Sequence, residues 1–374
     1  MSELRQIIEQ EIRERGPIPF SRYMELCLYH PQFGYYSRHA GQFGKAGDFY
    51  TSSDVHAVFG RLLARQFEEM WRALGSPETI TVKELGPGRG LFAQDVLDWS
   101  ERKFPNFFGA VRYVLVEQSP KLRERIANTL KGHFESGKAA FAGASRGEPE
   151  HSPAIIFANE FFDAIPVEVV SSRGTLRIGA EKGRFLESWT PSSADELEFL
   201  DRYSIHPESQ ERVEVPLQSQ TILRNAVADL ELGFAIVIDY GYAREEQLAG
   251  RHRGTLKAIR QHSVSANPYE APGEQDITAD VNFTALAAAA EKQGMQVQKL
   301  ITQSQFLMGI GEGNQFADAF EECRLPQERA KVALQLKHLV TPAGMGESFH
   351  VLLASKGIEA AKIAGLAGLN FGRR

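Results

Sequence analysis

The sequence predicts an α/β protein with a mostly parallel sheet covered by helices on both faces, and two observations support this fold class. Apolar segments of strand length alternate with segments of helical periodicity through the middle of the chain, which is the pattern of successive βαβ units. Two of the strands, Ile155-Ile156-Phe157 and Ala235-Ile236-Val237-Ile238, are apolar throughout, as expected where both faces of a sheet are buried.

Apolar spacing and turn residues place the elements of this fold in order along the chain. Residues 3–15 carry apolar side chains at helical spacing and are followed by Gly16-Pro17, and a second helix begins near Ser21. A third helix is expected over residues 54–74. The alternating region then predicts strands at 79–85, 112–117, 153–158, 234–239 and 349–354, with helices at 91–103, 121–131 and within 305–340.

Residues 165–216 interrupt this alternation with three short segments typical of antiparallel strands separated by glycine turns. We therefore divide the chain into an N-terminal helical extension or lid (1–75), a core (76–356) and a tail (357–374). The core contains the β insertion at 165–216 and a helical insertion at 305–345. The tail is rich in Ala and Gly, and we expect it to be loosely ordered.

Composition restricts the class of protein. The 374 residues, 43% of them hydrophobic, are enough for a substantial globular core. The net charge of −6 gives no positive field that would attract nucleic acid. The two cysteines, Cys27 and Cys323, have no metal or redox spacing, so no metal is expected. The sequence has no apolar run long enough to cross a bilayer and no apolar signal core, which predicts a soluble cytoplasmic protein.

A glycine-rich turn, Glu84-Leu85-Gly86-Pro87-Gly88-Arg89-Gly90, joins the first strand of the alternating region to a helix. Glycines let the backbone approach a ligand closely, and ligands of open α/β sheets bind at the carboxyl ends of strands. The glycine spacing differs from the dinucleotide fingerprint, and Pro87 removes an N–H that a pyrophosphate would use. The turn therefore favours S-adenosylmethionine, and Glu84 is expected to face its ammonium group or a bound water.

Glu117 ends the next strand. An acid at this place can accept hydrogen bonds from both ribose hydroxyls of an adenosine group. Because nicotinamide enzymes use the same device, Glu117 indicates adenosine in general. The alternative is a tight turn and a nearby acid with no ligand.

The strand at 153–158 leads into Asn159-Glu160-Phe161-Phe162-Asp163. By topology this strand neighbours the glycine-turn strand, so an acceptor would meet the methyl group at its tip, where positioning is the main catalytic task. Paired carboxylates suit a guanidinium acceptor, so Glu160, Asp163 and Asn159 are the candidate catalytic residues. A solvated acidic turn and a helix cap at Asp163 are the alternatives. Asp239, at the end of the next strand, is equally compatible with a site role and with a structural one.

Together these blocks resemble the MidA-type methyltransferases, a family that includes the mitochondrial complex I assembly factor. The resemblance covers residues 2–356 and also rests on segments 28–36, 47–52, 238–241, 254–257 and 272–280. It implies a class I methyltransferase (Rossmann-like) fold. It also implies that S-adenosylmethionine is held by Gly86, Gly88, Gly90 and Glu117 and covered by Asp48 and Thr51 from the N-terminal loop.

The same resemblance implies methylation of a protein arginine, in the mitochondrial relatives on a subunit of respiratory complex I in the matrix. Some positions depart from the family pattern: Ser53-Asp54 where Pro-Glu is usual, Lys257 where arginine is common, and Asn282 where aspartate is usual. Three other functions stay open: a small-molecule methyltransferase with the same donor, a non-catalytic assembly factor, and a nicotinamide oxidoreductase, which Pro87 disfavours. The sequence does not identify the acceptor protein or residue, the degree of methylation or the oligomeric state.

Overall fold

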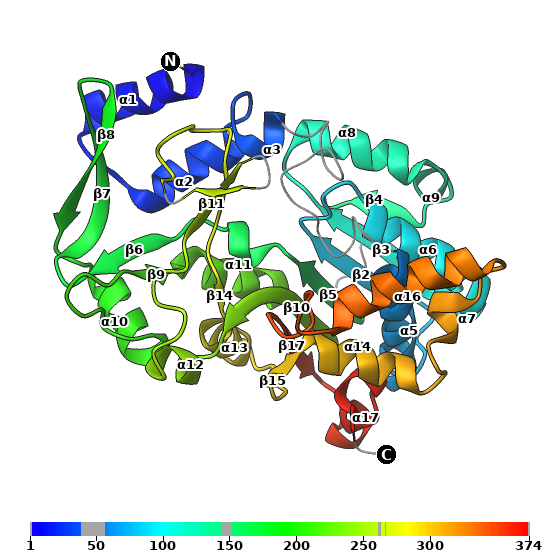
Figure 1. The fold of residues 1–374 in the computed structure, drawn as a ribbon. Coiled ribbons are helices and arrows are strands. Elements are labelled where there is room, and N and C mark those ends of the chain that lie inside the picture. Colours follow the sequence, from blue (N-terminus) through cyan, green and yellow to red (C-terminus); the bar gives the residue numbers. More distant parts are fainter. Residues whose placement is uncertain (1, 39–56, 144–151, 261–262, 266, 373–374) are drawn as a thin grey trace. The chain divides into compact units, whose positions relative to one another are not determined.

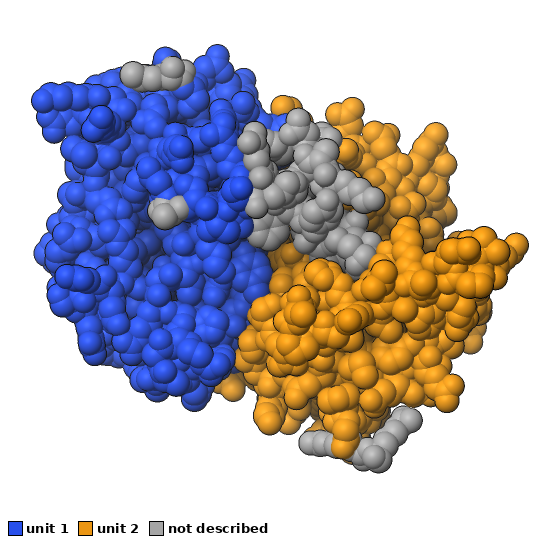
Figure 2. Space-filling model, in the orientation of Figure 1, with its two compact units in different colours: residues 1–49, 161–224, 240–289 blue, residues 50–160, 225–239, 290–374 orange. Residues whose placement is uncertain are grey.

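The computed structural model describes residues 2–38, 57–143, 152–260, 263–265 and 267–372. Figure 1 shows its helices and strands. The chain forms two compact units, which Figure 2 draws in different colours. Unit 1 comprises residues 1–49, 161–224 and 240–289, and unit 2 comprises residues 50–160, 225–239 and 290–374.

A largely parallel sheet forms the centre of unit 2, as the sequence predicted. Its strand order is β15-β17-β10-β5-β2-β3-β4, and the pairs β10–β5, β5–β2, β2–β3 and β3–β4 are all parallel. β15 and β16 pair antiparallel with β17. The bounds are β2 Ile80–Leu85, β3 Val111–Val116, β4 Ala139–Phe141, β5 Ala154–Asn159, β10 Gly233–Tyr242, β15 Gln296–Val297, β16 Ile301–Thr302 and β17 Phe349–Lys356.

Aromatic side chains fix two helices of unit 2, α5 and α6, to this sheet. Phe92 of α6 stacks on Phe157 of β5 with ring centroids 4.5 Å apart, and Phe67 of α5 meets the same ring edge-on at 5.5 Å. All three rings are buried, so α5 and α6 share one face of β5. The helices are α5 Ala57–Ala73, α6 Leu91–Lys103, α7 Pro105–Ala110, α8 Pro120–Thr129, α9 Lys131–Glu135, α14 Gln303–Glu312, α15 Ala317–Phe320 and α16 Pro326–Val340.

The C-terminal residues up to 372 are ordered, which corrects the expectation of a loose tail. They form α17 (Ala360–Ala364) and a 3₁₀ turn η3 (Ala367–Leu369), and Ile363 is buried. Two side chains of α5 hold η3. Gln66 accepts a hydrogen bond from the Gly368 N–H at 2.9 Å, and Glu69 accepts one from the Ala367 N–H at 3.0 Å. The Ala/Gly composition of the tail did not predict this anchoring, because the two acceptors lie in α5, far away in the sequence.

Unit 1 contains the predicted β insertion as a five-stranded antiparallel sheet, order β1-β7-β6-β9, with β8 paired to β7. A second, three-stranded antiparallel sheet has the order β12-β11-β13. The strands are β1 Ile18–Pro19, β6 Glu168–Ser171, β7 Gly174–Glu181, β8 Arg184–Thr190, β9 Val213–Val215, β11 Lys257–Arg260, β12 Ser263–Ser265, β13 Asp276–Thr278 and β14 Val281–Asn282. The helices are α1 Glu3–Arg15, α2 Phe20–Tyr29, α3 Tyr35–Arg38, η2 Phe162–Ala164, α10 Ala194–Tyr203, α11 Leu217–Val227, α12 Arg244–Leu248 and α13 Phe283–Glu291, of which α11 and α13 run into unit 2.

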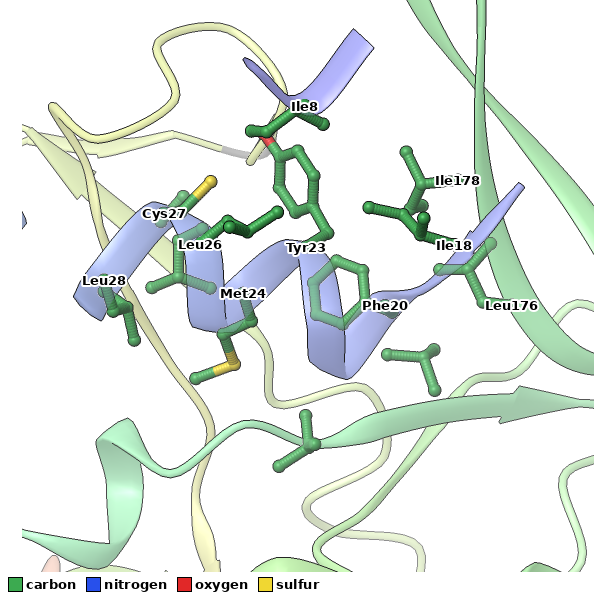
Figure 3. Packing of buried hydrophobic residues seen from close by; sticks show 14 of the residues in the cluster. Ile8, Ile18, Phe20, Tyr23, Met24, Leu26, Cys27, Leu28, Leu176 and Ile178 are labelled. Atoms are coloured by element: carbon green, nitrogen blue, oxygen red, sulfur yellow. The ribbon is translucent and has the colours of Figure 1, made fainter. Parts of the chain in front are cut away.

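The N-terminal helices and the β insertion share one hydrophobic core. Figure 3 shows Tyr23 and Phe20 of α2 in the same cluster as Ile8 of α1 and Ile178 of β7. These four side chains are completely buried. The two regions are remote in sequence, so neither buries its apolar face without the other.

Candidate active site

The glycine-rich turn at the carboxyl end of β2 adopts a conformation that favours glycine. Gly86, Gly88 and Gly90 have φ values of 64°, 55° and 78°, in the region that L side chains rarely adopt. A Cβ at Gly90 would lie 3.3 Å from the Ile126 side chain of α8, so this glycine permits helix packing. A Cβ at Gly88 would meet no described atom within 4 Å. No described residue therefore fills the space in front of Gly88, where a ligand can approach the backbone.

Glu84 is buried beside this turn. One of its carboxylate oxygens, Oε2, accepts a hydrogen bond from the Tyr113 hydroxyl of β3 at 2.9 Å. Burial raises the pKa of Glu84 to about 8, against an ordinary value of 4.5. The side chain therefore carries a proton at neutral pH unless a cation comes close to it.

Glu117 follows β3 directly and lies at the same edge as the turn, because Leu85 of β2 and Val116 of β3 are in register. The Gly86 N–H donates to the Val116 carbonyl at 3.1 Å, which joins the turn to this strand end. The Glu117 carboxylate accepts the Ser119 N–H at 2.7 Å, and partial burial raises its pKa. One carboxylate oxygen is thus used in fixing the loop.

Asn159 and Glu160 stand at the end of β5, which pairs with β2 on one side and β10 on the other. The Asn159 Nδ2 donates to Glu160 Oε1 at 3.2 Å. Among the described residues, the buried Oδ1 of Asn159 has no hydrogen-bond partner. Glu160 has a φ of 48°, which is unusual for a residue with a side chain, and its N–H donates to the Ile238 carbonyl.

Acidic side chains thus gather at one edge of the unit 2 sheet. Glu84, Glu117 and Glu160 come from the carboxyl ends of three adjacent strands, and Asp239, fully buried, comes from a fourth. Such an arrangement favours a positively charged ligand. The amino-acid ammonium and the sulfonium of S-adenosylmethionine carry the positive charge that this arrangement favours.

Asp163 lies within η2 of unit 1 and does not cap a helix. Its Oδ2 accepts a hydrogen bond from the Tyr240 hydroxyl at 2.5 Å. Burial raises the pKa of Asp163 to about 6. Tyr240 was not predicted from the sequence, since a tyrosine at a strand end carries no motif signal, and the same is true of Tyr113. Asp48 and Thr51 lie outside the described residues.

Asn282 serves a structural role that needs an amide. Its Nδ2 donates to the Tyr203 carbonyl at 2.9 Å, and its Oδ1 accepts the Ala285 N–H in the first turn of α13, also at 2.9 Å. A carboxylate would satisfy only the second of these contacts.

Among the described residues, no group of three His, Cys, Asp or Glu side chains is arranged to hold a metal ion. No described helix is long and apolar enough to cross a membrane.

Comparison with known proteins identifies the family. A family model described as S-adenosyl-L-methionine-dependent methyltransferase matches residues 62–301. The chain belongs to this family. It therefore uses S-adenosylmethionine as methyl donor, which confirms the donor predicted from the glycine turn.

Similar proteins cover nearly the whole chain. A solved structure of a likely methyltransferase from Burkholderia thailandensis, bound to S-adenosyl-homocysteine, is 29% identical with a TM-score of 0.82, covering 98% of this chain and 94% of that one. The mitochondrial protein arginine methyltransferase NDUFAF7 homolog of Drosophila melanogaster is 28% identical, covering 95% of this chain and 85% of its own. The human NDUFAF7 is 27% identical, with 91% and 80% covered. The resemblance inferred from the sequence motifs is confirmed.

Replacing Gly88 with Val tests the turn as the donor site. We expect the affinity for S-adenosylmethionine to fall at least about 100-fold, measured by calorimetry, because the new side chain occupies space before the turn that no described residue fills. Gly75→Val is the matched control, since Gly75 also has a positive φ (91°) and no atom within 4 Å of its Cβ. Both variants carry the left-handed strain of about 1–2 kcal/mol, so equal donor binding by the two would rule out the site.

Replacing Glu84 with Gln tests its burial through the pH dependence of stability. A carboxyl whose pKa rises from 4.5 to about 8 on folding favours the folded state most at low pH, and this contribution is lost as pH rises through that interval. Urea unfolding at pH 5, 7 and 9 should therefore show the stability of Glu84→Gln increasing steadily relative to wild type. A constant difference across this range would show that Glu84 is ionised in the folded protein.

Proposed function

We propose that this methyltransferase methylates an arginine side chain of a protein. The observation that carries the proposal is the Asn159–Glu160 pair, in which a carboxylate and a buried amide oxygen without a described partner stand together at the carboxyl end of β5. Relatives from Drosophila and human, similar over most of the chain, are named protein arginine methyltransferases, which supports this acceptor class.

The donor-binding roles in this proposal belong to the edge formed by β2 and β3. Gly86, Gly88 and Gly90 give the backbone close approach to the donor, with Pro87 shaping the turn. Glu117 accepts the ribose hydroxyls, and Glu84 ionises when the donor's ammonium is next to it. The bound donor supplies an electrophilic methyl group.

The acceptor roles belong to Asn159 and Glu160. A guanidinium has N–H groups in a planar fork, and a carboxylate can accept two of them at once. Glu160 would hold the fork in this way and draw its positive charge to one side, which leaves the reacting nitrogen more nucleophilic. The Oδ1 of Asn159, an acceptor without a described partner, would receive a further N–H and fix the nitrogen's direction.

The backbone at Glu160 supports a functional role. A non-glycine residue in the left-handed region costs on the order of 1 kcal/mol, and such residues cluster at active sites where the strain sets a side-chain direction. Glycine at position 160 would remove this strain. The presence of glutamate there is best explained by a need for its carboxylate.

The acceptor class is tested by incubating the protein with methyl-labelled S-adenosylmethionine and a lysate of its own cells from which its gene has been deleted. We expect the label in protein, and mass spectrometry should locate it on arginine. Label confined to the low-molecular-weight fraction would instead establish the alternative, a small-molecule methyltransferase. Label on a protein residue other than arginine would also contradict the proposal.

Replacing Glu160 with Gln removes the charge while keeping the shape. We expect single-turnover methyl transfer to the lysate proteins to slow at least about 100-fold, the low end for one lost transition-state contact, with donor affinity unchanged. Glu101→Gln, which alters an exposed carboxylate on α6, is the control. Glu160→Gly should be equally inactive yet as stable as wild type or more so. Wild-type turnover by Glu160→Gln would exclude the carboxylate grip.

A further inference from the structure

The exposed face of α16 has no part in the donor and acceptor sites described above. Figure 1 draws this helix in orange, and it belongs to unit 2 (Figure 2). Leu339 is its one buried residue, whereas Leu334 is 68% exposed. The exposed face consists of Leu334 and the exposed residues three and four positions from it along the helix, which are Ala330, Lys331, Lys337 and His338.

Contacts at its two ends fix the orientation of α16 without using the exposed face. At the start, the Glu328 carboxylate accepts the backbone N–H groups of Arg324 at 2.7 Å and Leu325 at 2.9 Å. At the end, the buried Gln303 of α14 donates its side-chain N–H to the Leu339 carbonyl at 2.9 Å. Both ends of the helix therefore have capping contacts within unit 2, so the exposed face is held in a preorganised position.

Two lysines flank Leu334 on the exposed face. A single exposed leucine is common on protein surfaces, so the groups around Leu334 decide whether this surface suits a partner. Lys331 and Lys337 are six residues apart, which is about 9 Å along the helix axis, and Leu334 lies midway between them. The exposed face therefore presents one large apolar side chain between two cations.

Residues 324–340 carry charge of opposite sign to the rest of the chain. They contain one acid and four cations, which are Arg324, Arg329, Lys331 and Lys337. Their net charge is therefore +3, and because the whole chain has −6, the other residues together carry −9. Such a local charge asymmetry is typical of an interaction surface.

The acids that precede Lys331 in the sequence contact other groups. Glu328 accepts the two backbone N–H groups at the helix start. Glu321 and Glu322 form ion pairs with cations of α5 and α6. Within the described part of the chain, neither Lys331 nor Lys337 is in an ion pair. Both lysines can therefore pair with acids of another molecule.

We propose that the exposed face of α16 is a docking surface for the protein acceptor, and that it binds an acidic part of the acceptor in which two carboxylates flank an apolar depression. This inference rests on the proposed function, because it assumes a protein acceptor. Leu334 fills the depression as the apolar anchor. Lys331 and Lys337 pair with carboxylates about 9 Å apart.

The charges within unit 2 suit an acceptor that carries both signs. The edge of the parallel sheet has Glu84, Glu117 and Glu160, which favour a cation such as the reacting guanidinium, whereas α16 favours an anion. An acceptor with an arginine and an acidic patch at separate places meets both requirements. Opposite charges at two places also restrict the orientation in which the acceptor docks.

The exposed face suits a membrane or a second copy of the chain less well. A helix that lies on a membrane needs a wide apolar face, and this face has Leu334 as its one large apolar side chain. In a symmetric contact between two copies of α16, Lys331 and Lys337 would meet the same lysines of the other copy, and like charges repel.

The test is methyl transfer from labelled S-adenosylmethionine to the proteins of the gene-deleted lysate, measured over a wide range of lysate concentration. Combining Lys331→Glu with Lys337→Glu reverses both charges. We expect the lysate concentration that gives half-maximal labelling rate to rise at least about 10-fold. Leu334→Ser removes the anchor and should raise it about 10-fold. The maximal rate and the donor affinity should be unchanged in both.

Matched controls separate docking from a general change of the surface. Leu325 is 55% exposed and lies nine residues before Leu334, which at roughly 100° per residue is the opposite side of the helix. Combining Lys299→Glu with Lys362→Glu makes the same change of net charge at two exposed positions of unit 2. Leu325→Ser and this second pair should label with the wild-type dependence on lysate concentration.

Salt dependence is a second readout, which a folding defect would not reproduce. Raising the salt from about 0.1 to 1 M shortens the Debye length from about 10 to about 3 Å. The wild type should then need about 10-fold more lysate for half-maximal labelling, because its lysines are screened. The Lys331→Glu, Lys337→Glu variant should need less lysate at high salt than at low salt, since its repulsion is screened instead.

The outcomes distinguish this inference from the proposed function. If the Lys331→Glu, Lys337→Glu variant labels proteins as the wild type does at both salt concentrations, the docking surface is wrong and the proposed function stands. If the wild type labels no protein, both fail. A wild-type dimer in sedimentation velocity that this variant dissociates would assign the surface to self-association and overturn the proposal. Co-sedimentation with vesicles of anionic phospholipid that the same variant abolishes would overturn it in favour of a membrane.

Discussion

The parallel pairing of β3, β2, β5 and β10 is the constraint on which the site depends. Because these strands run in the same direction, their carboxyl ends meet at one edge, and the registers Leu85 with Val116 and Ile238 with Asn159 bring four chain segments together there. A shift by one residue would turn every side chain to the opposite face. The hydrogen bond from Gly86 to Val116 extends this register into the glycine turn.

The pKa of each buried acid depends on the groups that contact its carboxyl. Burial alone would neutralise Glu84, whose described partner is the neutral hydroxyl of Tyr113. A nearby cation reverses this preference, so the residue is suited to respond to a positively charged donor. Asp163 is buried to a similar degree but has a lower pKa, which its Tyr240 hydrogen bond helps to maintain. Two buried acids with different partners thus have different pKa values, because environment sets each pKa.

Features encoded locally could be predicted from the sequence. Apolar runs identified the strands of the parallel sheet, and glycine spacing with Pro87 indicated the donor. The features that escaped depend on contacts between distant segments. Tyr113 and Tyr240 were missed because their hydroxyls contact Glu84 and Asp163, which are distant in sequence. A tyrosine in a strand is otherwise typical of the hydrophobic core. The N-terminal helices and the β insertion share one core, and Gln66 anchors the C-terminal turn. Both contacts join segments that are distant in sequence, so no local pattern predicts them.

Two of the departures from the family pattern, Asn282 and Lys257, fit the chemistry of the neighbouring residues. Asn282 uses both ends of its amide to fix Tyr203 and the start of α13, so the loss of a charge there leaves the acids of the site untouched. Lys257 keeps the positive charge that an arginine would bring, and its compact ammonium can contact Asp280 while facing the Tyr240 ring. An arginine would bring a planar fork better suited to grip Asp280 with two hydrogen bonds, which would draw its charge away from the ring. Lysine at this position therefore favours influence on Tyr240 over a stronger ion pair.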